Sequence, residues 1–283
     1  MLEKNINNIL GCDKSYTESK IIVFGAPYDG TTSYRPGARF AGSAIRNESY
    51  SIETYSPYQN KDLDDICVFD AGDLELPYGN PANVLEQIEK FVLKILNDDK
   101  IPLMIGGEHL VSLGAVRAAV KNYKDLYIIH FDAHSDLRDD YLGEALSHAT
   151  VMRRCWDLVG DYRIFQFGIR SGSRDEISWG KEHVHTCFFN FDQLDTAADT
   201  LKGKPVYLTI DLDVLDTSVF PGTGTPEAGG VTFCELLDAV KKVSELNIVA
   251  LDITELSPPL DPTGASTSLA CKLLREILLY VYK

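Results

Sequence analysis

Eight short stretches of the chain are apolar on both faces, which is the pattern of strands buried inside a sheet. Each runs for five to eight residues, is rich in β-branched and aromatic side chains, and is bounded by turn-forming residues. Parallel strands that are covered by helices on both sides have this continuous apolar pattern. We therefore predict strands at residues 21–27, 66–70, 101–107, 126–132, 163–169, 185–191, 206–213 and 247–253.

Between these strands, apolar residues recur every three or four positions, as on the buried stripe of a helix. The clearest case begins after Asn80 and Pro81, which suit an N-cap and a first helical turn, and continues to Leu96. Similar patterns predict helices at residues 109–123, 148–159, 232–246 and 266–282. The alternation predicts an α/β protein, either a closed (β/α)₈ barrel or an open doubly wound sheet. In both architectures the site lies beyond the carboxyl ends of the strands.

Composition narrows the picture to a soluble globular protein. The chain has 283 residues, 45% hydrophobic and 24% charged, without repeats or linkers, so we expect one domain over residues 1–283. The net charge of −15 makes nucleic acid and anionic membranes improbable partners. The polar start excludes a secretory signal, and no apolar run approaches membrane-spanning length. Six scattered cysteines without a C-x-x-C pair fit reduced thiols, so we expect a cytoplasmic protein.

One predicted strand ends abruptly in acidic residues and a histidine. Residues 127–136 read YIIHFDAHSD, so Asp132, His134 and Asp136 alternate and would face one side if the chain stayed extended. Carboxylates this close repel one another unless a cation holds them or they are solvated on an exposed loop. The motif therefore indicates either a cation site or a solvated turn.

Two further strand ends carry the same residue types. IGGEH leads through two glycines to His109, and TIDLD ends in Asp211 and Asp213. Four carboxylates and two imidazoles at strand ends match the ligands of a two-metal hydrolytic site. Because thiolates are absent, this set favours Mn²⁺, although Zn²⁺, Co²⁺ or Fe²⁺ could occupy such ligands. The acidic site would suit a cationic substrate.

Several neighbouring residues have simpler interpretations. DLDVLD is not a calcium-binding loop, because Asp216 stands where that loop needs glycine and Gly222 where it needs glutamate. We expect His130 to be buried and hydrogen-bonded within its strand. Asp70 and Asp73, in FDAGD, we interpret as structural or as supporting the site from outside.

The motifs GGEH, DAHSD and TIDLDVLD, followed by PGTGTPEAGG, resemble the signature blocks of the ureohydrolases, the arginases, agmatinases and their relatives. The resemblance extends from GAPYDGTTSYRPGARFAGSAIR, which begins at Gly25, to ELSPPLDPTGASTSLACKLLREIL near the end. It implies a three-layer α/β/α fold with a mostly parallel eight-stranded sheet and two Mn²⁺ per subunit. It also implies a homo-oligomer, usually a trimer or hexamer.

Matched by position, the resemblance implies six metal ligands: His109, Asp132, His134, Asp136, Asp211 and Asp213. Asp132 and Asp211 would bridge both ions. The first ion would also contact His109 and Asp136, and the second would contact His134 and Asp213.

The same resemblance implies catalytic roles for three residues. Glu255, in ITELSPP, matches the glutamate that grips the guanidinium group, and Asp136 would pass a proton to the departing nitrogen. His148, in LSHATVMRR, matches a histidine that shuttles protons or positions substrate, and its ordinary titration range suits that work. Many agmatinases have glycine after this histidine, where this chain has Ala149.

Substrate choice depends on the loop LRDDYLGEALSH. It lacks the Asn- and Ser-containing segment with which arginases bind an α-carboxylate, and it carries Asp139, Asp140 and Glu144 instead. A carboxylate-bearing substrate would be repelled there, so we expect hydrolysis of agmatine to putrescine and urea, a reaction of polyamine biosynthesis. Guanidinobutyrase, arginase or formimidoylglutamase activity remains an alternative, and a metal-binding scaffold without turnover is a third. Residues 221–230 and YDGTTSYRPGARF are expected to form walls of the pocket, the first with some mobility; the second is alternatively a subunit contact.

Overall fold

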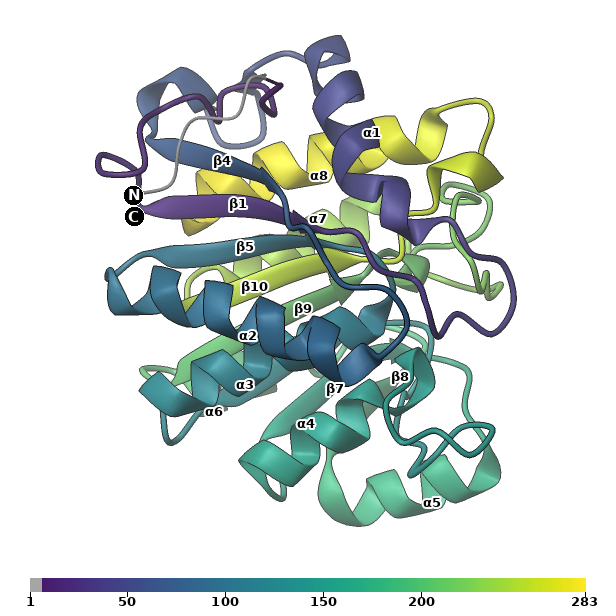
Figure 1. Cartoon of the computed structure of the whole chain (residues 1–283). Helices are drawn as coiled ribbons and strands as arrows, with labels where there is room; N and C mark the ends of the chain where they lie inside the picture. Colours follow the sequence, from purple (N-terminus) through teal and green to yellow (C-terminus); the bar gives the residue numbers. More distant parts are fainter. Residues whose placement is uncertain (1–6) are drawn as a thin grey trace.

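The computed structural model describes residues 7–283, so the first six residues of the polar start, and of the expected domain 1–283, lie outside the described residues. The main sheet contains β1 (Ile21–Ala26), β4 (Val68–Asp73), β5 (Ile101–Gly106), β6 (Tyr127–Phe131), β7 (Ile164–Ile169), β8 (His185–Phe188), β9 (Pro205–Asp211) and β10 (Asn247–Thr254). Its order is β4-β1-β5-β10-β9-β6-β7-β8, and all neighbouring strands are parallel (Figure 1). Because β4 and β8 are edges, the sheet is open and the barrel alternative is excluded.

Helices cover both faces of the sheet, which gives the expected three-layer α/β/α arrangement (Figure 1). One face is covered by α2 (Pro81–Asn97), α3 (Ser112–Asn122) and α4 (Val151–Val159). The other is covered by α1 (Ala41–Glu48), α6 (Leu194–Leu201), α7 (Phe233–Val243) and α8 (Ala265–Val281). The helix α5 (Arg174–His183) contacts the edge strand β8.

Smaller elements lie in the connections. The two-stranded hairpin of β2 (Tyr55–Ser56) and β3 (Lys61–Asp62) is separate from the main sheet. Single 3-10 turns are η1 (Ala38–Phe40), η2 (Ser49–Ser51), η3 (Leu63–Asp65), η4 (His109–Val111), η5 (His148–Thr150), η6 (Leu212–Val214) and η7 (Pro258–Leu260). Three of these turns, η4, η5 and η6, carry residues of the candidate site.

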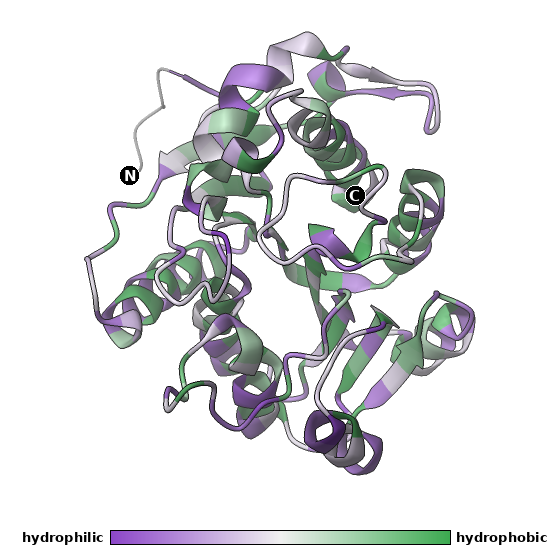
Figure 2. Ribbon diagram, turned by 90° about the vertical axis from the view of Figure 1, so that its right-hand side faces the viewer, coloured by the Kyte–Doolittle hydropathy of each residue, from purple (hydrophilic) through white to green (hydrophobic). Residues whose placement is uncertain are grey.

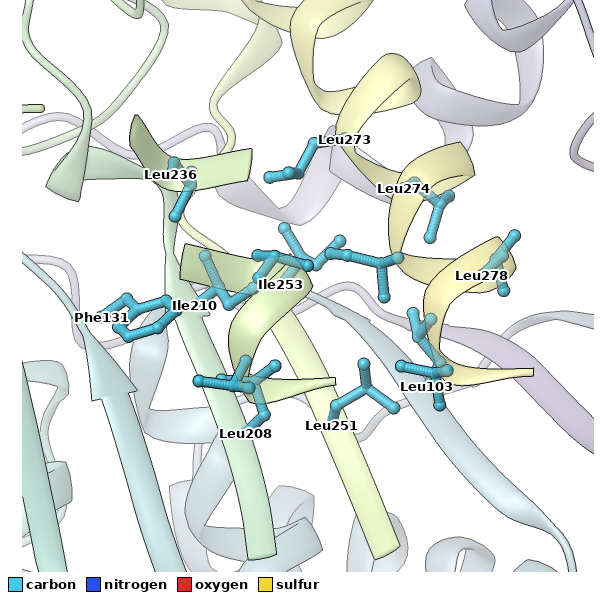
Figure 3. Packing of buried hydrophobic residues seen from close by; sticks show 14 of the residues in the cluster. Leu103, Phe131, Leu208, Ile210, Leu236, Leu251, Ile253, Leu273, Leu274 and Leu278 are labelled. Atoms are coloured by element: carbon cyan, nitrogen blue, oxygen red, sulfur yellow. The ribbon is translucent and has the colours of Figure 1, made fainter. Parts of the chain in front are cut away.

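The hydrophobic core is divided in two by the sheet. Leu208 and Ile210 of β9 pack in the cluster that includes Leu274 of α8 (Figure 3), whereas Tyr207, which directly precedes Leu208, belongs to the cluster on the opposite face. Successive strand residues point to opposite faces, and both faces are buried here. This explains the continuous apolar pattern of the sequence. Figure 2 views the edge where the strands end, with hydrophobic residues concentrated on the strands and inner helix faces.

The predicted elements are present, with shifted boundaries. The helices expected to start at His109 and His148 instead begin with the turns η4 and η5, followed by α3 and α4. The helices α1, α5 and α6 were not predicted from the sequence. They are 8 to 10 residues long, and α5 in particular has few apolar positions to form a stripe. Among residues 7–283, no helix is long and apolar enough to cross a membrane.

Candidate active site

The sheet order brings residues from distant parts of the sequence to one edge. The strands β5, β10, β9 and β6 are consecutive neighbours in the middle of the sheet, and all of them run in the same direction. Their carboxyl ends therefore meet, and His109, Glu255, Asp211 and Asp132 follow or end these four strands in turn. All four side chains are buried. The site is thus built by strand order, as expected for an open α/β sheet.

Around His109, three carboxylates converge on one ring nitrogen. Nδ1 of His109 lies 3.0 Å from Oδ2 of Asp132, 3.1 Å from Oδ2 of Asp136 and 3.5 Å from Oδ2 of Asp211. The other ring nitrogen, Nε2, lies 2.9 Å from the hydroxyl of Thr209, which fixes the ring orientation. Nδ1 itself is buried and makes no hydrogen bond of acceptable geometry. Four potential ligand atoms thus surround one small volume.

A second cluster shares Asp132 with the first. Nδ1 of His134 lies 2.9 Å from Oδ2 of Asp213 and 3.5 Å from Oδ1 of Asp132. The second oxygen of Asp213 accepts a hydrogen bond from the Ala133 amide at 3.1 Å, and the Asp213 amide donates to Asp211 at 2.8 Å. Because the two oxygens of Asp132 face different histidines, this carboxylate is placed to join the two clusters.

Two site carboxylates belong to residues with a left-handed backbone. Asp136 has φ of 51° and Glu255 has φ of 63°. Non-glycine residues rarely adopt this conformation, and it persists where the surrounding structure over-determines it, frequently at functional sites. At Glu255 the turn directs Oε1 to the amide of His109 at 2.7 Å. The backbone therefore fixes the position of this carboxylate next to the first cluster.

The site has an excess of negative charge that the protein does not neutralise. Burial and the Asp132 carboxylate raise the pKa of Asp136 to about 7. Burial and Asp213 raise the pKa of Asp211 well above its ordinary value, and burial and Glu108 do the same for Glu255. Burial alone would lower the pKa of His109, but the carboxylates of Asp132 and Asp136 have the larger effect, so the pKa is raised. Each shift reports crowding of carboxylates in a medium of low dielectric constant.

This arrangement fits divalent cations. In the part of the chain that the structure describes, Asp132, Asp136, Asp211 and Asp213 form ion pairs only with histidines, never with lysine or arginine. Oxygen and imidazole ligand atoms within 4.8 Å of one another form two groups, one containing His109, Asp132 and Asp136 and the other Asp132, His134 and Asp213. Metal ions would relieve the repulsion between the carboxylates, and the Nδ1 atom of His109, which has no hydrogen-bond partner, could coordinate one of them.

His130 supports the first cluster from beneath. Its Nε2 lies 2.7 Å from Oδ2 of Asp132, and its Nδ1 lies 3.0 Å from the side-chain amide of Gln166. It is fully buried, as predicted. Although it lies close enough to count with the first group, both its ring nitrogens already have partners. Its role is therefore to orient Asp132.

A cavity of about 340 Å³ opens above the clusters. It is lined by Ser33, His134, Ser135, Asp136, Arg138, Tyr141, His148, Ala149, Ser171, Gly172, Ser173, Glu176 and Thr225. His148 is held there twice: its amide donates to the Thr31 hydroxyl and its Nε2 lies 3.0 Å from the Ser33 hydroxyl. Burial, with repulsion from His134 and His109, lowers its pKa to about 4. The position suits a histidine that contacts a bound substrate.

The loop after Asp136 contributes differently from the sequence-based expectation. Arg138 and Tyr141 line the cavity, whereas Asp139, Asp140 and Glu144 do not. Asp139 forms an ion pair with Arg154 instead, outside this cavity. Arg138 pairs with the buried Glu176 at 3.3 Å and stacks on Tyr141. The acidic residues therefore form no part of the cavity wall, whereas the Arg138 guanidinium group borders the cavity.

Both loops expected to form pocket walls reach the cavity, through Ser33 and Thr225. Arg35 ties these two loops together by donating to the carbonyls of Thr223 and Gly224. By contrast, Asp70 and Asp73 pair with Arg46 and line no part of the cavity. They have the structural role expected from the sequence.

Sequence reasoning missed two features of the pocket. Glu108, fully buried, accepts hydrogen bonds from the amide of Thr31 and the hydroxyls of Thr31 and Thr32, and so anchors the loop that holds His148. The other is Arg138, which follows the DAHSD motif directly. Its position two residues after Asp136, a predicted metal ligand, could have identified it in the sequence as a residue near the site.

Comparison with known proteins places the chain in a family. The model of the Arginase family matches residues 19–280. An agmatinase from Bacillus cereus is 47% identical over 270 residues, covering 94% of this chain and 93% of its own. The human mitochondrial guanidino acid hydrolase is 34% identical, over 90% of this chain and 76% of its own.

The fold agrees with these similarities. The crystal structure of the agmatine ureohydrolase of Thermoplasma volcanium has a TM-score of 0.89 and 35% identity, and covers 98% of this chain and 94% of its own. The resemblance noted in the sequence motifs is therefore confirmed across nearly the whole length. The chain belongs to the arginase family.

Proposed function

We propose that this chain hydrolyses the guanidinium group of agmatine to putrescine and urea. The observation that carries the proposal is the convergence of four buried carboxylates and two histidines beneath a cavity of about 340 Å³. The agmatinase from Bacillus cereus supports the substrate, because it matches almost end to end at 47% identity. A cation fits this acidic site better than a neutral molecule.

The ligand set supports two divalent cations per chain, which we take to be Mn²⁺. His109, Asp132, His134, Asp136, Asp211 and Asp213 would hold them, and Asp132 belongs to both clusters. When bound, such a pair supplies Lewis acidity and makes water nucleophilic near neutral pH. The oxygen-rich set favours manganese over zinc.

The remaining chemistry belongs to three side chains. In the overall reaction, water oxygen bonds to the guanidinium carbon, the bond from that carbon to the alkylamine nitrogen breaks, and a proton reaches the departing nitrogen. Glu255, held by the His109 amide, would accept hydrogen bonds from the guanidinium nitrogens. His148 would hold a proton at Nε2 on the cavity side, and Asp136 would deliver one to the leaving nitrogen.

The second candidate is hydrolysis of a guanidino acid, such as 4-guanidinobutyrate. Two observations favour it: the human relative bears the name guanidino acid hydrolase, and Arg138 borders the cavity. Against it, Arg138 is already paired with Glu176. Arginine and formimidoylglutamate also carry carboxylates that could approach Arg138, so the cavity residues do not separate these two substrates from 4-guanidinobutyrate.

The proposal also covers domain organisation, location in the cell and assembly. The chain acts as a single ureohydrolase domain, residues 1–283, in the cytoplasm. It assembles as a trimer or hexamer, as the sequence resemblance implies. Sedimentation of the purified protein tests the assembly.

A panel of substrates tests the function. Chelator-stripped protein reloaded with Mn²⁺ should release urea from agmatine with a kcat/KM at least about tenfold higher than from arginine or 4-guanidinobutyrate, which corresponds to about 1.4 kcal/mol. Metal content is measured on the same samples. Urea release that is fastest from 4-guanidinobutyrate would favour the second candidate, and no release from any guanidino compound would contradict both.

A further inference from the structure

Arg170 directly follows β7 and donates hydrogen bonds to five main-chain carbonyl groups. Its Nη1 lies 3.2 Å from the carbonyl oxygen of Gly168 and 3.1 Å from that of Val214. Its Nη2 lies 2.7 Å from the carbonyl of Asp213, with further contacts to the carbonyls of Leu215 at 3.4 Å and Glu227 at 2.8 Å. Three of these carbonyls belong to residues 213–215, the turn that carries Asp213.

The main chain of Arg170 and Ser171 holds the loop that carries Asp132 and His134. The amides of Arg170 and Ser171 both donate to the carbonyl of Ala133, at 2.8 and 2.9 Å. Ala133 lies between Asp132 and His134, and its own amide donates to Asp213. One residue therefore fixes the loop that carries His134 through its backbone and the turn that carries Asp213 through its side chain.

The contact to Glu227 extends this network to the glycine-rich loop, residues 221–230. Gly229 and Gly230 of that loop donate to the carboxylate of Asp216, which immediately follows the Asp213 turn. The loop also carries Thr225, which lines the cavity. Arg170 thus connects the Asp213 turn with a wall of the cavity.

Arginine suits this position for a geometric reason. The planar guanidinium group presents five N–H donors in a fixed fork, whereas the lysine ammonium group offers three donors from one point. Among residues 7–283, no carboxylate forms an ion pair with Arg170. Its charge is directed at carbonyl dipoles instead, so its contribution is the alignment of backbone segments.

We propose that Arg170 is a positioning residue that places His134 and Asp213 correctly within their group with Asp132 and docks the glycine-rich loop beside that group. The inference rests on the proposed function in one respect, that this group binds a divalent cation. The Arg170 side chain does not line the cavity, and its hydrogen bonds go to main-chain carbonyls outside the group around His109. Its loss should therefore weaken one cation site selectively.

The test compares Arg170→Met and Arg170→Lys with a matched control, Arg163→Met. Arg163 precedes the same strand at its opposite end and donates to a single carbonyl, that of Lys124. Each chelator-stripped full-length protein is titrated with Mn²⁺ by calorimetry. Amide hydrogen exchange is followed over residues 212–230, and the free energy of unfolding is measured in urea.

For Arg170→Met we expect one of two Mn²⁺ binding steps to weaken by about 10- to 100-fold, the usual effect of losing a group that orients metal ligands. The other step should change by less than about threefold, and exchange over residues 212–230 should accelerate. Arg170→Lys should give a smaller effect in the same direction, and Arg163→Met should leave both binding steps as in the wild type.

Three results separate the possible failures. If Arg170→Met lowers only the free energy of unfolding and leaves both binding steps unchanged, the residue is merely structural and the proposal is overturned. Equal weakening of both steps would also overturn it. If the wild type binds two ions but releases no urea from guanidino compounds, the proposed function fails while the selective weakening still supports the role of Arg170.

Discussion

His109 and Glu255 are 146 positions apart in the sequence, yet the amide of His109 donates a hydrogen bond to Oε1 of Glu255 at 2.7 Å. The contact is possible because β5 and β10 are adjacent, so the segments that follow them run side by side. A candidate metal ligand and the candidate guanidinium-binding carboxylate are thus parts of one structural unit. Substitutions can test the proposed function by separating metal binding from guanidinium binding.

Replacement of Glu255 by glutamine should reduce catalysis without emptying the metal site. The glutamine carbonyl can still accept the His109 amide, so the turn is retained, but the negative charge facing the guanidinium group is lost. We expect kcat/KM for agmatine to fall by about 100-fold or more, the scale seen when one stabilising group is removed from a reaction centre. Urea release and metal content are measured together. Loss of both ions would instead make Glu255 part of the metal site.

Replacement of Asp132 by asparagine should remove metal and activity together. This carboxylate faces His109 with one oxygen and His134 with the other, so the two clusters lose a common anion. We expect fewer than one Mn²⁺ per chain by elemental analysis and urea release near background. Asp139→Asn, which changes an exposed carboxylate outside the cavity, is the control. Full activity with normal metal content in Asp132→Asn would refute the ligand assignment.

Replacement of His148 by asparagine should reduce turnover but leave folding and metal content intact. The loop is held through the His148 amide and Thr31, which the substitution preserves. We expect kcat to fall by about 100-fold, within the range for loss of a general acid or base. Stopped assays of urea release and urea denaturation of the same protein check this. A variant with wild-type kcat would show that the histidine has no part in the reaction.

Replacement of Arg138 by methionine should shift selectivity toward the dication. Removal of this charge leaves Glu176 without its arginine partner and makes the cavity more negative. We expect the ratio of kcat/KM for agmatine to that for 4-guanidinobutyrate to rise by at least about threefold. Arg154→Met, which removes an ion pair outside the cavity, should leave the ratio unchanged. An unchanged ratio in Arg138→Met would mean that the substrate does not approach this guanidinium group.

Asp261 should stabilise the fold in a pH-dependent way. Burial would raise the pKa of this carboxyl, but hydrogen bonds from Ser266 and Thr263 outweigh it and lower the pKa to about 2. A lowered pKa means that the stabilisation is complete above the unfolded-state pKa of about 3.9 and is lost as pH falls toward about 2. The shift corresponds to about 2.6 kcal/mol.

The substitution Asp261→Asn should therefore lower the free energy of unfolding at pH 7 by about this amount. Urea denaturation of metal-free protein at pH 7, 5 and 3.5 should show an equal deficit at the first two values and a smaller one at the third. Asp199→Asn, at an exposed position of α6, makes the same charge change and should have little effect. A deficit that grows as pH falls would contradict the sign of the shift.

The strands and the identity of the chemical groups at their ends could be predicted from the sequence alone. Apart from hydrogen-bonded exceptions such as Asp252, which is buried within β10, charged residues of strands that are covered on both faces occur where the strand leaves the core. Asp132 and Asp211 mark two such points, and His109 a third, in a chain with only six histidines. Long amphipathic helices such as α2 were equally clear, whereas the short helices α5 and α6 lacked a sufficient stripe.

The order of the strands could not be predicted from periodicity, which is identical for any arrangement of buried parallel strands. Only the tertiary structure makes β5, β10, β9 and β6 neighbours and so joins His109 to Glu255. It also decides which side of a loop faces the cavity, since that depends on packing around each turn. For this reason Arg138, and not Asp139, borders the cavity, and Arg170 donates to three carbonyls that lie 43, 45 and 57 positions away in the sequence.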